Sequence, residues 1–72
     1  MQINFYSMGG KQLDQVAVTV SNDGVLCFDE NTNFYAEAEA ALTCRREEGF
    51  THGMCEDADG NYYATWTIEG DI

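Results

Sequence analysis

Apolar and polar residues alternate along several segments of this chain, most clearly near its C-terminus. There Tyr62, Ala64, Trp66 and Ile68 alternate with polar or hydroxyl-bearing residues. A period of two places successive side chains on opposite faces of a β-strand. We therefore expect Trp66 on a buried face that it shares with Tyr62 and Ile68. The segments expected to form strands are residues 1–7, 13–21, 25–30, 50–56 and 61–69.

Turn-forming residues separate these segments. Gly9 and Gly10 follow the first, and the sequence SNDG, residues 21–24, separates the second from the third. Asn, Asp and Gly tolerate the left-handed backbone conformations of tight turns, so SNDG is a strong hairpin signal. Residues 57–60 join the last two strands in the same way. Connections this short predict that the strands they join pair antiparallel.

One segment, NTNFYAEAEAALTCRREEG, has the spacing of a helix rather than a strand. Thr32 or Asn33 can cap its N-terminus, and Gly49 stands where a left-handed C-cap belongs. The residues expected to form the stripe that packs on the sheet are Phe34, Ala38, Ala41, Leu42 and Arg45.

The expected order of elements is β-β-β-α-β-β. It predicts an α+β fold in one domain, residues 1–72: an antiparallel sheet of four to five strands with one helix on one face. One helix cannot cover both faces, so the opposite face should be partly open to a partner or to a second copy in a homodimer. The residues assigned to this open face are Tyr6, Ala17, Thr19, Cys27, Tyr63, Thr65 and Thr67.

Charge is the outlying property of the composition. Thirteen Asp and Glu oppose three Lys and Arg, for a net charge of −10. Direct binding of nucleic acid or of anionic membranes is disfavoured, because both need a basic surface. A basic protein is the expected partner. The sequence shows no signal peptide or membrane segment, and its odd number of cysteines suits a reducing cytoplasm.

The acids before the last strand raise the question of calcium. Asp57, Asp59 and Asn61 match the first, third and fifth positions of an EF-hand loop. Such a loop then requires Gly at Tyr62 and Glu at Ile68, and neither is present. We therefore expect a hairpin turn and no bound metal.

Catalytic signatures are also absent from the sequence. His52 is the only histidine, and Cys55 follows three residues later. A thiol and an imidazole can form a nucleophile pair or half of a zinc site. In a strand, however, residues 52 and 55 point to opposite faces. The expectation is a protein that is not an enzyme and holds no cofactor.

The acidic residues remain as the candidate binding site. One reading is a solvated surface that keeps the protein soluble. The sharper reading is an array of carboxylates that imitates nucleic-acid phosphates, which duplex DNA carries every ~1.7 Å along its axis. The residues assigned to partner binding are Glu47, Glu48, Glu56, Asp57, Asp59, Asp29, Glu30 and Tyr63.

In its size, its DADGNYYATWTIEG hairpin, its EAEAALTCRREEG helix and its charge, the chain resembles the small acidic inhibitors of phages and mobile elements, above all anti-CRISPR proteins. The resemblance is one of kind, spans all 72 residues and contains no diagnostic motif. Members of this class share no common fold, so no residue role is transferred by position. The resemblance implies a cytoplasmic inhibitor, in the host cell if a phage encodes it, that blocks the DNA-binding groove of a CRISPR effector. Two alternatives remain, an antitoxin-like binding module and an oligomeric structural or accessory protein.

Overall fold

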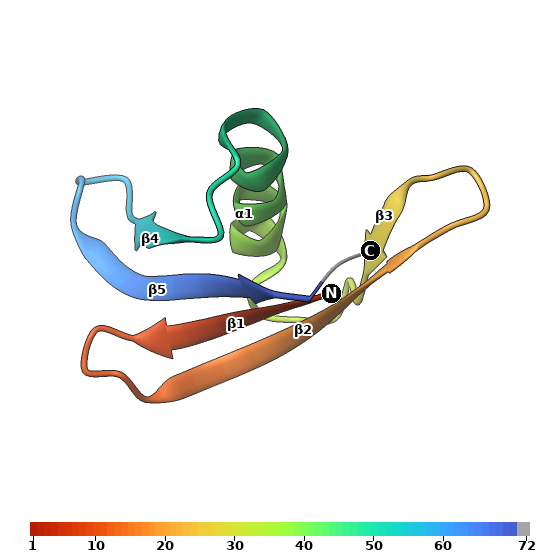
Figure 1. Cartoon of the computed structure of the whole chain (residues 1–72). Coiled ribbons are helices and arrows are strands. Elements are labelled where there is room, and N and C mark those ends of the chain that lie inside the picture. Colours follow the sequence, from red (N-terminus) through yellow and green to blue (C-terminus); the bar gives the residue numbers. More distant parts are fainter. Residues whose placement is uncertain (71–72) are drawn as a thin grey trace.

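A computed structural model describes residues 1–70, which form one antiparallel sheet and one helix. The strands lie in the order β3-β2-β1-β5-β4, and α1 packs on one face (Figure 1). The expected α+β fold and order of elements are therefore confirmed. The bounds of the elements are β1 Gln2–Ser7, β2 Gln12–Val20, β3 Leu26–Phe28, α1 Tyr35–Glu48, β4 His52–Glu56 and β5 Tyr62–Glu69.

Strand β1 lies at the centre of the sheet. It pairs with β2 on one side, where Ile3 lies opposite Val16, and with β5 on the other, where Phe5 lies opposite Trp66. The last strand thus returns to the first, and β4 is left as an edge strand. Figure 1 shows the β4–β5 and β2–β3 hairpins at opposite ends of the molecule.

The core lies between α1 and the sheet. The helix contributes small residues, Ala38 and Ala41, which let its axis approach the strands closely, and Phe34 stacks on Phe5 with ring centroids 4.6 Å apart. Burial of Trp66, only 6% exposed, confirms the expected core role of this residue. The buried apolar residues are Ile3, Phe5, Val16, Val18, Ala38, Ala41, Leu42, Cys55, Ala64, Trp66 and Ile68.

A β-bulge changes the faces expected for two tyrosines. Cys55 pairs with Ala64 but Glu56 pairs with Tyr62, so Tyr63 is an extra residue in β5. A bulge interrupts the alternation of faces. As a result Tyr62 is 56% exposed rather than part of the core. Tyr63 is displaced from the open face and lies with helix residues such as Glu37. Both expectations were wrong for this one reason.

The helix ends where expected but begins later. Gly49 adopts the left-handed conformation, with φ of 77°, and its N–H bonds to the carbonyl of Arg45. At the other end the N-cap is Phe34, without a side-chain cap, rather than Thr32 or Asn33. The Thr32 hydroxyl still accepts the N–H of Phe34, but it donates its proton to Asp14, which ties the helix start to β2. No helix within residues 1–70 has the length and apolar character needed to cross a bilayer.

Candidate functional site

The acidic residues assigned to partner binding fall into two groups. Glu47 and Glu48 end α1, and Glu56 stands where β4 passes into the β4–β5 hairpin. Asp29 and Glu30 instead follow β3, and Asp29 lies in a hollow beside β2. The structure therefore gathers one group around β4 and leaves Asp29 and Glu30 at the β3 end.

The β4–β5 hairpin is confirmed, and Asp57 has a structural role in it. Its Oδ1 accepts the backbone N–H groups of Asp59 and Asn61, both at 2.9 Å. A carboxylate that organises its own turn is typical of Asx-type turns. Glu56 and Asp59 are exposed. Among residues 1–70, no three His, Cys, Asp or Glu residues are grouped so as to hold a metal ion.

Two adjoining hollows separate α1 from the edge strand β4, and we call them together the β4 groove. The first has a volume of about 410 Å³ and the second of about 250 Å³. Both share Ala40 of the helix, Met54 of β4 and Trp66 of β5. The helix and β4 run in opposite directions along the groove. Helix residues 40–48 line the first hollow together with residues 50–54, and helix residues 36–40 line the second together with residues 54–56.

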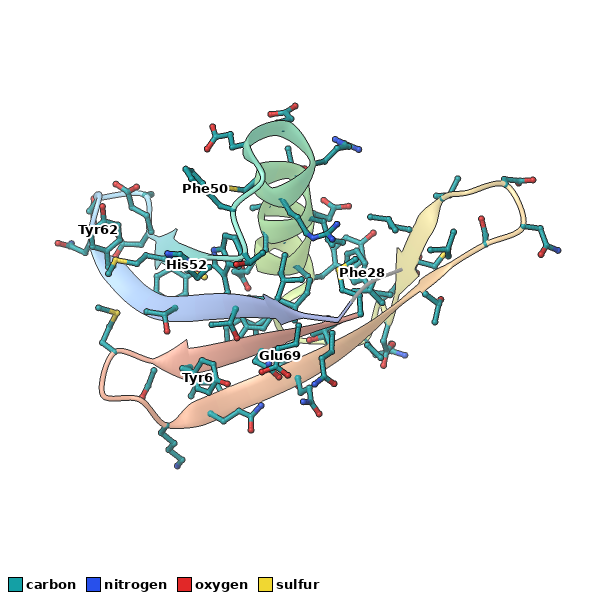
Figure 2. The ribbon with its side chains drawn as sticks, viewed as in Figure 1. Tyr6, Phe28, Phe50, His52, Tyr62 and Glu69 are labelled. Atoms are coloured by element: carbon teal, nitrogen blue, oxygen red, sulfur yellow. The ribbon has the colours of Figure 1, made fainter. Side chains whose placement is uncertain are left out.

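A close backbone approach shapes the wall of the groove. Gly53 lies opposite Trp66, and a Cβ at this glycine would stand 2.6 Å from the indole Cζ2. The indole therefore fills the place that a side chain at position 53 would take. Beside it, Phe50 and Met54 are about half exposed, at 52% and 53%. Figure 2 shows Phe50 beside α1 on the side where β4 runs.

Carboxylates stand around this partly apolar groove. Glu48 lines its first hollow, and Glu37 and Glu56 line its second. No lysine or arginine of the described chain lines either hollow. Arg46 is two residues from Glu48, about half a helical turn, and so lies on the other side of the helix, where it lines a hollow on the β3 side together with Glu39. The β4 side of the helix therefore presents a single sign of charge.

Ionisable groups in the groove respond to this charge. Burial raises the pKa of the Cys44 thiol, and the carboxylate of Glu48, which accepts its S–H at 3.8 Å, raises it further. Burial, followed by the nearby charge of Glu37, raises the pKa of Cys55 and of Tyr63. A thiol that keeps its proton is a poor nucleophile. Burial and the nearby carboxylates thus disfavour thiolate chemistry at Cys44 and Cys55.

The open face of the sheet has a different character. Asn4 is 2% exposed, and its Oδ1 accepts the side-chain amides of Gln12 and Gln15 at 3.3 and 2.9 Å. Its own amide donates to the hydroxyl of Thr67 at 3.4 Å. Tyr6 and Glu69 lie on this side, away from α1 (Figure 2). The face is a network of uncharged amides and hydroxyls with few carboxylates.

Comparison with known proteins gives no relative. The chain matches no protein-family model, and it matches neither a curated protein nor a solved structure.

Several groove residues were not among those that the sequence indicated. Glu37, Ala40 and Met54 were not assigned to the site, whereas Glu48, Glu56 and Tyr63 were. The signal for the helix side was a second stripe, Ala40, Cys44 and Glu48 at intervals of four, next to the core stripe. Periodicity could not show that this second stripe faces an edge strand.

Proposed function

We propose that the protein is a non-enzymatic inhibitor that binds a basic surface of a nucleic-acid-binding protein and keeps nucleic acid away from it. The observation that carries the proposal is the single sign of charge on the β4 side of the molecule. Glu37, Glu48 and Glu56 surround a groove that no lysine or arginine within residues 1–70 lines, and Glu47 and Asp59 extend the charge beyond it.

Electrostatic attraction of this kind acts in two ways. A net charge of −10 speeds the encounter with a basic partner by long-range steering. Once bound, carboxylates that occupy a Lys- and Arg-lined surface exclude phosphates from it. The acids therefore serve both recognition and competition.

The resemblance to anti-CRISPR proteins gives the proposal its specific target class, a CRISPR effector whose DNA-binding surface the protein blocks in the cytoplasm. The three cysteines, Cys27, Cys44 and Cys55, are free thiols, which suits a reducing compartment.

Competition for DNA tests this proposal. A panel of purified CRISPR effector complexes bound to labelled target DNA is titrated with the protein, and bound DNA is followed by fluorescence anisotropy. We expect release of DNA from at least one complex, with an inhibition that weakens steeply as salt is added, because screening reduces exposed charge pairs. If every complex retains its DNA, inhibition of CRISPR effectors is ruled out.

Charge-reversal variants separate local recognition from net charge. Glu47→Lys and Asp59→Lys change exposed residues on the β4 side, and neither side chain has a structural hydrogen bond among the described residues. Asp57 is a poor choice for lysine because its carboxylate holds the turn. Asp23→Lys is the matched control, since it makes the same charge change in the β2–β3 hairpin at the other end of the molecule (Figure 1).

Inhibition should fall about tenfold or more with either β4-side reversal, a loss of about 1.4 kcal/mol, and should change much less with Asp23→Lys. Equal effects of all three reversals would mean that only net charge matters. Loss of inhibition on substitution of Tyr6 or Thr65, with the acids unimportant, would instead assign the function to the open sheet face.

A further inference from the structure

The edge strand β4 keeps part of its backbone hydrogen-bonding capacity free. The N–H of Ile68 bonds to the carbonyl of Thr51 at 2.8 Å, which makes these two residues a hydrogen-bonded pair. Such pairs alternate with non-bonded pairs along an antiparallel ladder. Since His52 lies opposite Thr67 and Met54 opposite Thr65, the backbone groups of His52 and Met54 point away from β5.

Nothing in the described chain pairs with that edge. β4 is the last strand of the sheet, and within residues 1–70 no loop or cap hydrogen bond reaches the backbone of His52 or Met54. An unpaired edge is a template for a further strand, and proteins usually blunt it with lysine, proline or a covering element. β4, with the sequence HGMCE, contains no lysine and no proline.

The groove beside this edge fits an extended chain. An added strand lies about 4.8 Å from β4 and places alternate side chains on opposite sides. The side chains of the added strand that point toward the helix would meet Ala40, Cys44 and the indole of Trp66. Glu37 and Glu48 lie toward the two ends of the groove. The small side chain of Ala40 leaves room between the two carboxylates.

From this geometry we infer that the β4 groove binds an extended peptide segment in which Arg or Lys alternates with apolar residues, added to the sheet as a strand beside β4. This is recognition by β-augmentation, in which main-chain hydrogen bonds give affinity and alternate side chains give specificity. The inference rests on the proposed function only for the positive charge of the partner. It specifies the segment of that partner that binds.

The choice of occupant follows from charge. The larger hollow on the β3 side, about 750 Å³, is lined by both Glu39 and Arg46 and so favours neither sign of charge in a ligand. The β4 groove is lined by three carboxylates and no lysine or arginine of the described residues. A second copy of this chain would bring its own β4, with Glu56, against the same carboxylates. The partner is therefore a basic peptide of another protein.

A synthetic peptide tests the inference directly. The probe is a capped peptide of about seven residues that alternates Arg with Val, long enough to span β4 at ~3.3 Å per residue. Trp66, the only tryptophan, lines both hollows, so its fluorescence reports docking. We expect a saturable change in its emission, together with slower hydrogen exchange of the backbone amides of His52 and Met54 by NMR.

Two control peptides isolate the causes of binding. A peptide of the same Arg–Val sequence in which every backbone nitrogen is methylated has the same charge but cannot donate any of the main-chain hydrogen bonds of a strand. A peptide that alternates Glu with Val can form a strand but has the opposite charge. Both should bind at least about tenfold more weakly than the Arg–Val peptide, a difference of about 1.4 kcal/mol. If either binds equally well, or if the amides of His52 and Met54 exchange unchanged, the inference is wrong.

A variant of the edge strand adds a second arm. Met54→Pro removes the outward N–H while leaving the bonds to β5 in place, and Met54→Ala is its control because it shortens the side chain but keeps the N–H. The Arg–Val peptide should bind the proline variant about tenfold or more weakly than the alanine variant. Circular dichroism verifies that both variants fold. If the proline variant does not fold, the hydrogen-exchange experiment on the unmodified protein decides whether the peptide pairs with β4.

The same variants distinguish this inference from the proposed function. If Met54→Pro still competes with DNA on a CRISPR effector while Glu47→Lys and Asp59→Lys do not, the inhibitor function stands and the β-augmentation is wrong. If the Arg–Val peptide binds the groove as described but no effector loses its DNA, the groove stands and the proposed function is wrong.

Discussion

Replacement of Gly53 by alanine tests the close approach on which the shape of the β4 groove depends. A Cβ at this position would lie 2.6 Å from Cζ2, 2.7 Å from Cε2 and 2.8 Å from Nε1 of Trp66. Separations this short cannot persist, so either the indole must move or β4 must shift away from β5. The indole is almost buried, so its displacement is opposed by core packing except toward the β4 groove, which it lines.

The expected cost can be estimated from two opposing effects. Forcing an extra carbon into a packed site typically costs about 1–3 kcal/mol. The loss of glycine's flexibility in the unfolded chain returns about 0.4–1 kcal/mol. The net destabilisation should be about 1–2 kcal/mol, a substantial part of the roughly 4–11 kcal/mol expected for a domain of this length.

Urea denaturation followed by circular dichroism measures this change. With a slope of about 1 kcal/mol per molar urea for a small domain, the midpoint should fall by about 1–2 M. Gly9→Ala is the matched control, because the nearest atom to its new Cβ would be the Ser7 hydroxyl at 3.8 Å and the φ of Gly9 is not positive. That variant should be unchanged or slightly stabilised.

A double-mutant cycle checks the cause. In a Trp66→Phe background the smaller ring leaves more room, so Gly53→Ala should cost less than in the unmodified protein. If Gly53→Ala is as stable as Gly9→Ala, or if its cost is the same in both backgrounds, the close contact does not limit this site and the reasoning is refuted.

Two further predictions concern the core. Burial, with a smaller effect of Glu37, raises the pKa of Cys55 above its ordinary value of 9.0, so above that pH the unfolded chain binds fewer protons than the folded one. The free energy of unfolding should therefore fall as pH rises above about 9. Urea midpoints measured at a series of pH values should fall less steeply in Cys55→Ala than in the unmodified protein. An equal fall in both proteins would contradict the assignment of this pH dependence to Cys55. Trp66→Ala should cost about 3–5 kcal/mol and largely unfold the domain, whereas a circular dichroism melt that shows a shift of only a few degrees would mean that the indole packs less than its burial indicates.

Much of the fold could be predicted from sequence because its determinants are local. SNDG forms its turn through the backbone and hydroxyl of Ser21, which bond to Gly24 and Val25. Gly49 ends the helix in the left-handed conformation that few other residues adopt readily. Such features depend on a few neighbouring residues, so the pattern of residues is enough to identify them.

The faces of β5 show where local pattern is insufficient. Alternation assigned Trp66 and Ile68 correctly but failed at Tyr62 and Tyr63, because the extra residue in the pairing with β4 shifts the register there. A bulge is a property of two paired strands. No single segment of the sequence contains that information.

The candidate site depends still more on long-range contacts. The acids at the helix end and near the last hairpin were indicated by sequence, but their relation to each other depends on how α1 lies beside β4. That approach places Glu37 across from Glu56 and Glu48 toward the other end of the same groove, whose wall exists because residue 53 lacks a side chain. Charge composition can indicate the sign of charge expected of a partner, while the arrangement of α1 and β4 decides the shape of the groove. The combination of an unpaired strand edge and carboxylates of one sign is the basis of the inference that an extended basic chain, rather than a folded basic surface alone, binds this groove.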